Sequence, residues 1–84
     1  MLEIFKTNVT ESHQAELLIG QIQASFIHCE VTFDLDDCDR ILRVKSPETI
    51  NPQELINLLG RWGFHAELLQ DEILQENSQL QIRQ

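Results

Sequence analysis

The sequence holds four side chains of the kinds that bind transition metals, namely the carboxylate of Glu11, the imidazoles of His13 and His65, and the thiol of Cys38. A borderline metal ion such as zinc accepts all of these ligand types. The four residues are spread over most of the chain and form no short binding motif. They can act together only if the fold brings separate connections to one place, so the elements around them decide the matter.

Arrangements of side chains typical of enzymes are missing from the sequence. No nucleophilic side chain stands at a recognisable spacing from a base that could activate it. The three glycines are scattered and make no phosphate-binding loop. Cys29 and Cys38 have neither the spacing of a redox motif nor that of a zinc motif. We therefore expect a protein that is not an enzyme and that needs no cofactor.

Composition and charge narrow the class of protein further. The chain has 84 residues, of which 42% are hydrophobic, enough for one small globular domain. Its net charge of −8 argues against binding to nucleic acid or to an anionic membrane, because both reward Lys and Arg. No apolar run approaches the roughly 20 residues of a membrane span, and the first residues do not resemble a signal peptide. These features predict a cytoplasmic protein.

The first half of the sequence predicts a strand, a helix and a hairpin. Residues 2–9 are a strand in which both alternate sets carry apolar residues, so the pattern leaves open whether Phe5 faces the core or a partner. Thr10 or Ser12 can cap the helix that follows. The apolar stripe of this helix consists of Ala15, Leu18, Ile19, Ile22 and Phe26. Residues 27–35 and 41–45 are two strands joined by the acidic turn 36–39, which we expect to be solvated.

The second half predicts one helix and one short strand. Asn51 can cap a helix that has Pro52 at its first position, and Gly63 can end that helix in a left-handed conformation. The core face of this helix is predicted to consist of Leu55, Ile56, Leu58, Leu59 and Trp62. Residues 64–69 then form the last strand.

The order strand, helix, strand, strand, helix, strand is that of the ferredoxin-like βαββαβ fold, an α+β class. Right-handed crossovers give an antiparallel sheet with the spatial order 4-1-3-2 and both helices on one face. We expect one domain over residues 1–69. Residues 70–84 are a Gln- and acid-rich tail, either loose and dependent on a partner or able to add a helical turn or a strand.

This topology sorts the candidate ligands by the ends of the sheet. Glu11, Cys38 and both histidines at 13 and 65 fall at one end, and Cys29 falls at the other. Strands rise about 3.3 Å per residue, which separates the two cysteines by roughly 25–30 Å and excludes a disulfide between them. Cys29 shares a face with apolar residues and is predicted to be buried and inert. A metal site formed by Glu11, His13, Cys38 and His65 is therefore a hypothesis that the fold permits.

With this order of elements, residues 2–69 resemble a heavy-metal-associated domain, the fold of small copper chaperones. The resemblance rests on the residues of the predicted hairpin and on the stretch 56–68 with its Gly-aromatic turn. The family's metal motif is Gly-Met-x-Cys-x-x-Cys at the turn from the first strand to the first helix. In this chain Asn8 and Val9 stand at the Gly and Met positions, and Glu11 and Gln14 stand at the two Cys positions. Carboxylate and amide oxygens do not replace thiolates for Cu(I).

Two functions follow as expectations. The first is a small non-catalytic binding or interaction module that has lost its soft-metal thiols. Its partner would be another protein or a second copy of the chain, in a homodimer formed through a strand edge or the exposed sheet face. The alternative is a metal-ion carrier or sensor that binds a divalent transition metal such as zinc through Glu11, His13, Cys38 and His65.

Overall fold

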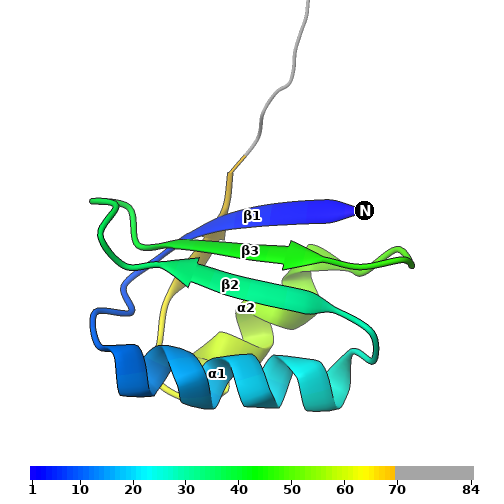
Figure 1. The fold of residues 1–84 in the computed structure, drawn as a ribbon, viewed down its shortest axis with the longest axis horizontal. Helices are drawn as coiled ribbons and strands as arrows, with labels where there is room; N and C mark the ends of the chain where they lie inside the picture. The colour runs from blue at the N-terminus through cyan, green and yellow to red at the C-terminus, as the bar shows by residue number, and fades with distance from the viewer. Residues whose placement is uncertain (70–84) are drawn as a thin grey trace, which may run out of the picture.

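The computed structural model describes residues 1–69 and places them in two layers, a four-stranded sheet and a pair of helices on one of its faces (Figure 1). The elements in chain order are β1 (Leu2–Thr7), α1 (Ser12–Ser25), β2 (Glu30–Asp34), β3 (Ile41–Lys45), α2 (Pro52–Arg61) and β4 (Ala66–Leu68). No helix in this part of the chain is long and apolar enough to cross a membrane. The predicted tail, residues 70–84, lies outside the described residues, and the predicted division of the chain at residue 69 stays a prediction.

The sheet has the order β2-β3-β1-β4, which is the predicted order 4-1-3-2 counted from the other edge. All three pairings are antiparallel. In the register, Phe5 lies opposite Leu42 on β3 and opposite Leu68 on β4. The ferredoxin-like βαββαβ fold is therefore confirmed. The register also settles the side of the sheet on which Phe5 lies, because Leu42 and Phe5 are both fully buried.

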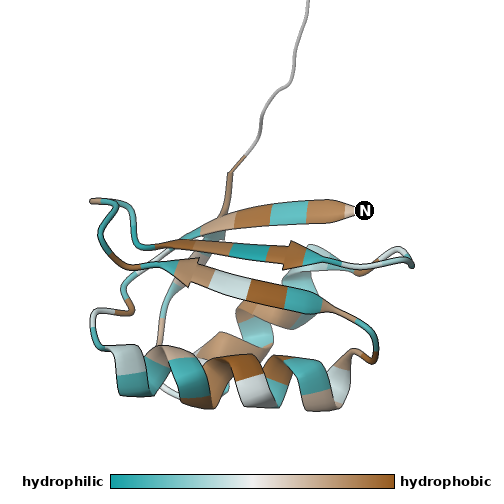
Figure 2. Ribbon diagram, viewed as in Figure 1, coloured by the Kyte–Doolittle hydropathy of each residue, from teal (hydrophilic) through white to brown (hydrophobic). Residues whose placement is uncertain are grey.

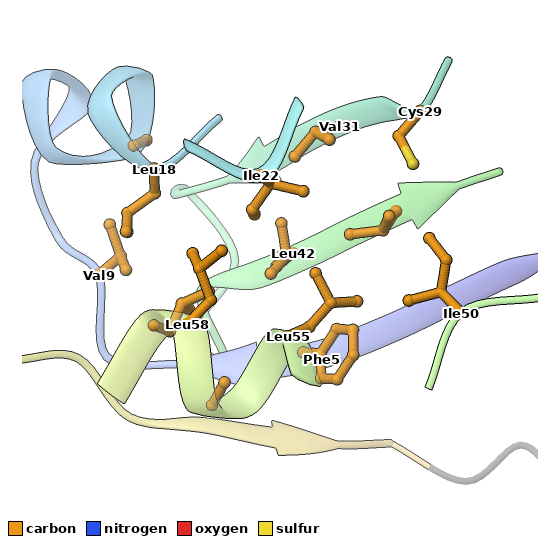
Figure 3. Close-up of a cluster of buried hydrophobic side chains, with 14 residues drawn as sticks. Phe5, Val9, Leu18, Ile22, Cys29, Val31, Leu42, Ile50, Leu55 and Leu58 are labelled. Carbon is orange, nitrogen blue, oxygen red and sulfur yellow. The ribbon is translucent and has the colours of Figure 1, made fainter. Parts of the chain in front are cut away.

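The hydrophobic core lies between the sheet and the two helices (Figures 2 and 3). Its fully buried members are Phe5, Val9, Leu18, Ile22, Leu42, Leu55 and Leu59. The residues of α1 in this set repeat at helical spacing, as the sequence predicts. Cys29 is buried in the same core, and the prediction of a buried position for it is confirmed.

Three details of the predicted elements are wrong. Trp62 is 44% exposed, because α2 ends at Arg61 and Trp62 is the cap residue, outside the apolar stripe of the helix. Residues Ile27 and His28 are exposed in the connection before β2 and do not belong to the strand. The N-cap of α1 is Glu11, where the sequence favours Thr10 or Ser12. The predicted left-handed conformation of Gly63, in contrast, is confirmed by its φ of 87°.

Candidate functional site

The candidate ligands lie at the end of the sheet formed by residues 8–11, 35–40 and 62–65, which we call the turn end (Figure 1). It contains the connection from β1 to α1, the hairpin between β2 and β3, and the connection from α2 to β4. Each of the four predicted metal ligands belongs to one of these connections or to the first turn of α1. The prediction that they share one end of the fold is in agreement with the strand order.

Glu11 and Gln14 form a capping box at the start of α1. The backbone N–H of Glu11 donates to Oε1 of Gln14 at 3.3 Å, and the Glu11 side chain faces the backbone N–H of Gln14 in return. Such a box satisfies backbone donors of the first turn that have no partner inside the helix. The two positions at which the resemblance places metal-binding thiols are thus engaged in capping the start of the helix.

Asn8 joins the first connection to the last one. Its side-chain Oδ1 accepts the backbone N–H of His65 at 2.8 Å, and its own backbone N–H donates to the His65 carbonyl at 3.3 Å. The two connections are therefore fixed to each other through the Asn8 side chain and through backbone groups of both residues, while the His65 imidazole takes no part in these bonds.

Thr7 joins the end of β1 to the hairpin. Its hydroxyl donates to the Arg40 carbonyl at 2.7 Å and accepts the backbone N–H of Val9 at 3.2 Å. Thr7 is 6% exposed, and its backbone N–H donates to the Asp39 carbonyl. On the surface, Lys6 Nζ lies 3.7 Å from Asp39 Oδ1, an exposed ion pair of the kind that contributes about 0–1 kcal/mol.

The structure brings the four predicted ligands together only in part. Glu11 Oε1 and His13 Nδ1 lie 3.8 Å apart, and both side chains are largely exposed. Among residues 1–69, the one group of three or more possible ligand atoms within 4.8 Å of one another belongs to Asp37, Cys38 and Asp39. Cys38 is thus close to its sequence neighbours, whereas His65, Cys38 and the Glu11–His13 pair do not form one ligand set in this conformation. The four-residue metal site stays a prediction.

The group around Cys38 includes two carboxylates that the predicted site omits. Asp37 and Asp39 flank Cys38 directly in the sequence, and this spacing is the signal that could have included them. The Asp37 carboxylate already accepts the backbone N–H of Asp39 at 2.8 Å, as in an ordinary turn. Cys38 is exposed, the other cysteine of the sequence, Cys29, is buried, and both thiols are free. The group is therefore an acidic turn with one accessible thiol.

Comparison with known proteins supports the fold. No model of a known protein family matches the chain, and no curated protein matches its sequence. A solved structure that is similar is the yeast copper transporter domain Ccc2a, determined in solution in apo and Cu(I)-loaded states. The similarity covers 84% of this chain and 97% of that domain, with 16% identity and a TM-score of 0.63. At this identity the match shows a shared fold, which is the fold that the resemblance to heavy-metal-associated domains implies.

Proposed function

We propose that this chain is a non-catalytic protein-interaction module on the fold of a heavy-metal-associated domain, and that it has lost the thiol pair used for soft metals. The observation that carries the proposal is the capping box of Glu11 and Gln14. Soft ions such as Cu(I) select sulfur, and neither a carboxylate nor an amide oxygen supplies it. The thiol at the turn end belongs to Cys38, which stands among carboxylates.

The chain would thus share the fold of metal-binding domains but use it to bind a protein. Domains of this size have little room for an enclosed pocket, so their function is carried by surfaces. The partner is a protein or a second copy of the chain, and neither nucleic acid nor an anionic membrane suits a net charge of −8. We place the module in the cytoplasm, where two free cysteines are stable as thiols.

A second candidate function is a carrier or sensor of a divalent metal such as zinc. It is favoured by the 3.8 Å approach of His13 Nδ1 to Glu11 Oε1, because imidazole and carboxylate are both zinc ligands. Cys38 and His65 would complete the site. Since their atoms are not grouped with that pair in this conformation, metal binding would have to draw the hairpin and the last connection toward α1.

Native mass spectrometry of the full chain, before and after addition of Zn(II) or Cu(I) under reducing conditions, tests both candidates. The interaction module predicts apo protein with either metal, together with a mass above that of the monomer or a partner that copurifies. One tightly bound zinc ion per chain, lost in the His13→Ala variant and retained in the His28→Ala variant, would establish the carrier and refute the module. His28 is the matched control because it is exposed at the opposite end of the sheet.

A gain-of-function variant tests the loss of the thiol pair directly. In the double variant Glu11→Cys/Gln14→Cys both thiols stand on the first turn of α1, and we expect it to bind one Cu(I) ion per chain that the natural sequence does not bind. The control is Gln21→Cys/Ala24→Cys, whose thiols have the same spacing on α1 but lie away from the turn end. Equal Cu(I) binding by the natural sequence and by the double variant would contradict the proposal.

A further inference from the structure

The opposite end of the sheet carries the two most exposed large apolar side chains of the described residues, Ile27 and Leu2. We call it the groove end and define it by residues 26–29 and 46–51 together with Met1 and Leu2 (Figure 1). Ile27 is 74% exposed, Leu2 54% and Met1 38%. In Figure 2 the connection between α1 and β2 is coloured as apolar over part of its length. A single exposed apolar side chain is common on protein surfaces, so Ile27 bears on function only through the hollow whose lining it joins.

A hollow of about 750 Å³ lies at this end, between the two connections and the first turn of α2. Apolar side chains of Phe26 and Ile50 belong to its lining, and Ile27 stands beside them. A second hollow of about 440 Å³ shares His28 and Ser46 with the first and includes Met1. Together they make a groove that is open to solvent and partly apolar, which is the form of surface that holds a peptide segment.

The charge of the groove selects the kind of segment. The lining of the larger hollow includes Glu48 and Glu54 and contains neither Lys nor Arg, and the smaller hollow adds one acid, Glu30, and one base, Lys45. A second copy of the chain carries the same net charge of −8. The chain's own residues 70–84 hold three acids, Asp71, Glu72 and Glu76, against the single base Arg83. Like charges close together oppose association, so both of these occupants are disfavoured against a cationic one.

We propose that the groove end binds a segment of a partner protein in which an aliphatic or aromatic side chain is flanked by Lys or Arg. The apolar side chain packs on Phe26, Ile27 and Ile50, and the cations pair with Glu48 and Glu54. Apolar burial supplies the affinity, and the carboxylates supply the choice of partner. This inference rests on the proposed function, because it names the surface and the chemistry through which the interaction module would act.

His28 is one of two residues other than glycine that have a left-handed backbone among residues 1–69, the other being Arg40 at the turn end. His28 has a φ of 68°, in the left-handed region that non-glycine residues seldom adopt. The next residue is tied back to α1, where the Gln23 side chain donates to the Cys29 carbonyl at 3.3 Å. The Gln23 bond therefore holds this connection to α1 on the C-terminal side of His28, and Ile27 is exposed at the rim of the groove.

The test uses the ¹⁵N-labelled full chain and a short synthetic peptide in which Leu residues alternate with Lys. We expect the peptide to shift the amide resonances of residues 26–29 and 48–54. Two control peptides, one with Glu in place of Lys and one with Ser in place of Leu, separate the charge from the apolar contact. Neither control is expected to shift the same set of resonances at equal concentration.

Matched variants assign the binding to the groove. Ile27→Ser should weaken the peptide about tenfold, and Glu48→Gln about threefold, in line with the loss of an apolar anchor and of one surface ion pair. The controls are Leu17→Ser, which removes an apolar side chain 44% exposed on α1, and Glu16→Gln. Both controls should leave the peptide affinity unchanged. All four substituted side chains are exposed, so we expect each variant to stay folded.

Four other outcomes overturn the inference. In the first two, the peptide shifts only resonances of the turn end or of the exposed sheet face, or it binds nowhere. In the third, the groove resonances shift when the protein is diluted without peptide, which identifies a second copy as the occupant. In the fourth, the groove resonances shift in the tail variant Ile73→Ser, which identifies the chain's own residues 70–84 as the occupant. None of these results refutes the interaction module itself. That proposal fails on a different measurement, the stoichiometric binding of a metal ion in native mass spectrometry.

Discussion

The turn end and the groove end are built from similar connections but are closed in different ways. At the turn end, side chains join connections that are far apart in the sequence, as in the bonds from Asn8 to His65 and from Thr7 to Arg40. At the groove end, the bonds of Gln23 and Ser46 reach residues six and two positions away, and the long-range bonds are those of Met1, whose terminal amine donates to the Ser46 carbonyl and whose Sδ accepts the Ile50 N–H. Among residues 1–69, no side-chain hydrogen bond joins the connection 26–29 to the connection 46–51, and the larger hollow lies between them.

The core is closed toward both ends: Val9 and Leu18, toward the turn end, are fully buried, and Cys29 and Ile50, toward the groove end, keep exposures of only 7% and 6% (Figure 3). The two ends therefore differ in their connections and hydrogen bonds. At the turn end, polar side chains already join distant connections within the monomer. At the groove end, polar and apolar groups that line the larger hollow remain accessible to a partner. This contrast teaches that the turn end uses its polar side chains to hold distant connections of the monomer together.

The largest expected effect is the loss of stability on truncating a buried side chain near the turn end, compared with truncating an exposed one beside it. Leu18→Ala should lower the free energy of unfolding by about 3–5 kcal/mol, because it leaves a cavity under α1. Trp62→Ala should lower it by less than about 1 kcal/mol, because the indole is nearly half exposed at the helix cap. Urea denaturation followed by circular dichroism measures both. If Trp62→Ala lowered the free energy of unfolding as much as Leu18→Ala, Trp62 would have to be buried in the core.

The second comparison uses a buried hydroxyl at each end. Thr7→Val should cost about 2 kcal/mol, because it leaves the Arg40 carbonyl and the Val9 N–H without their partner. Ser46→Ala should cost about 1 kcal/mol, because the Ser46 hydroxyl accepts one local bond, from the Glu48 N–H at 3.1 Å. Thr7→Ser keeps the hydroxyl and is the control. Equal losses for Thr7→Val and Ser46→Ala in the same denaturation experiment would show that the two ends are closed alike.

The elements of this fold follow from the sequence because each depends on neighbouring residues. Periodicity predicts both helices, and their order with right-handed crossovers predicts the sheet. Trp62 was misplaced because helical spacing extends the apolar stripe by one residue, while the helix itself ends at Arg61. Glu11 was missed as the cap because the preference for Ser and Thr concerns one residue, whereas this cap depends on the pair Glu11 and Gln14.

The sites are harder to predict than the fold because they depend on distances across the chain. Topology places Glu11, Cys38 and His65 at one end, yet neighbouring strands are separated by about 4.8 Å, and one such step is enough to keep ligand atoms apart. The groove depends on two connections, 26–29 and 46–51, that are distant in the sequence. The alternating pattern predicts that Ile27, directly after the stripe of α1, is the first residue of a strand. In the structure β2 begins at Glu30, so the exposure of Ile27 does not follow from the pattern.

The third comparison concerns the left-handed backbone at each end. Gly63 at the turn end has a φ of 87°, and Gly63→Ala should cost about 1–2 kcal/mol, because a Cβ is disfavoured in this region. His28 at the groove end has a φ of 68°, and His28→Gly should stabilise the protein by about 0.5 kcal/mol, the relief of strain less the entropy of glycine. Gly20→Ala is the control for Gly63→Ala. Gly20 lies in the interior of α1, where the same substitution adds helix propensity and should not destabilise the protein. A loss of stability in His28→Gly would mean that contacts of the imidazole hold the groove end.

The smallest expected effect tests whether the turn end is closed by the pair of residues that replaces the thiols. Glu11→Ala and Gln14→Ala should each cost about 0.5–1 kcal/mol, the usual range for an exposed helix cap. The double variant should cost about as much as either single variant, because the two side chains serve one capping box. Ser12→Ala, next to the cap, should change the denaturation midpoint little. Additive losses in the double variant would mean that Glu11 and Gln14 act separately, and the carboxylate of Glu11 would then be free to serve beside His13 as a metal ligand.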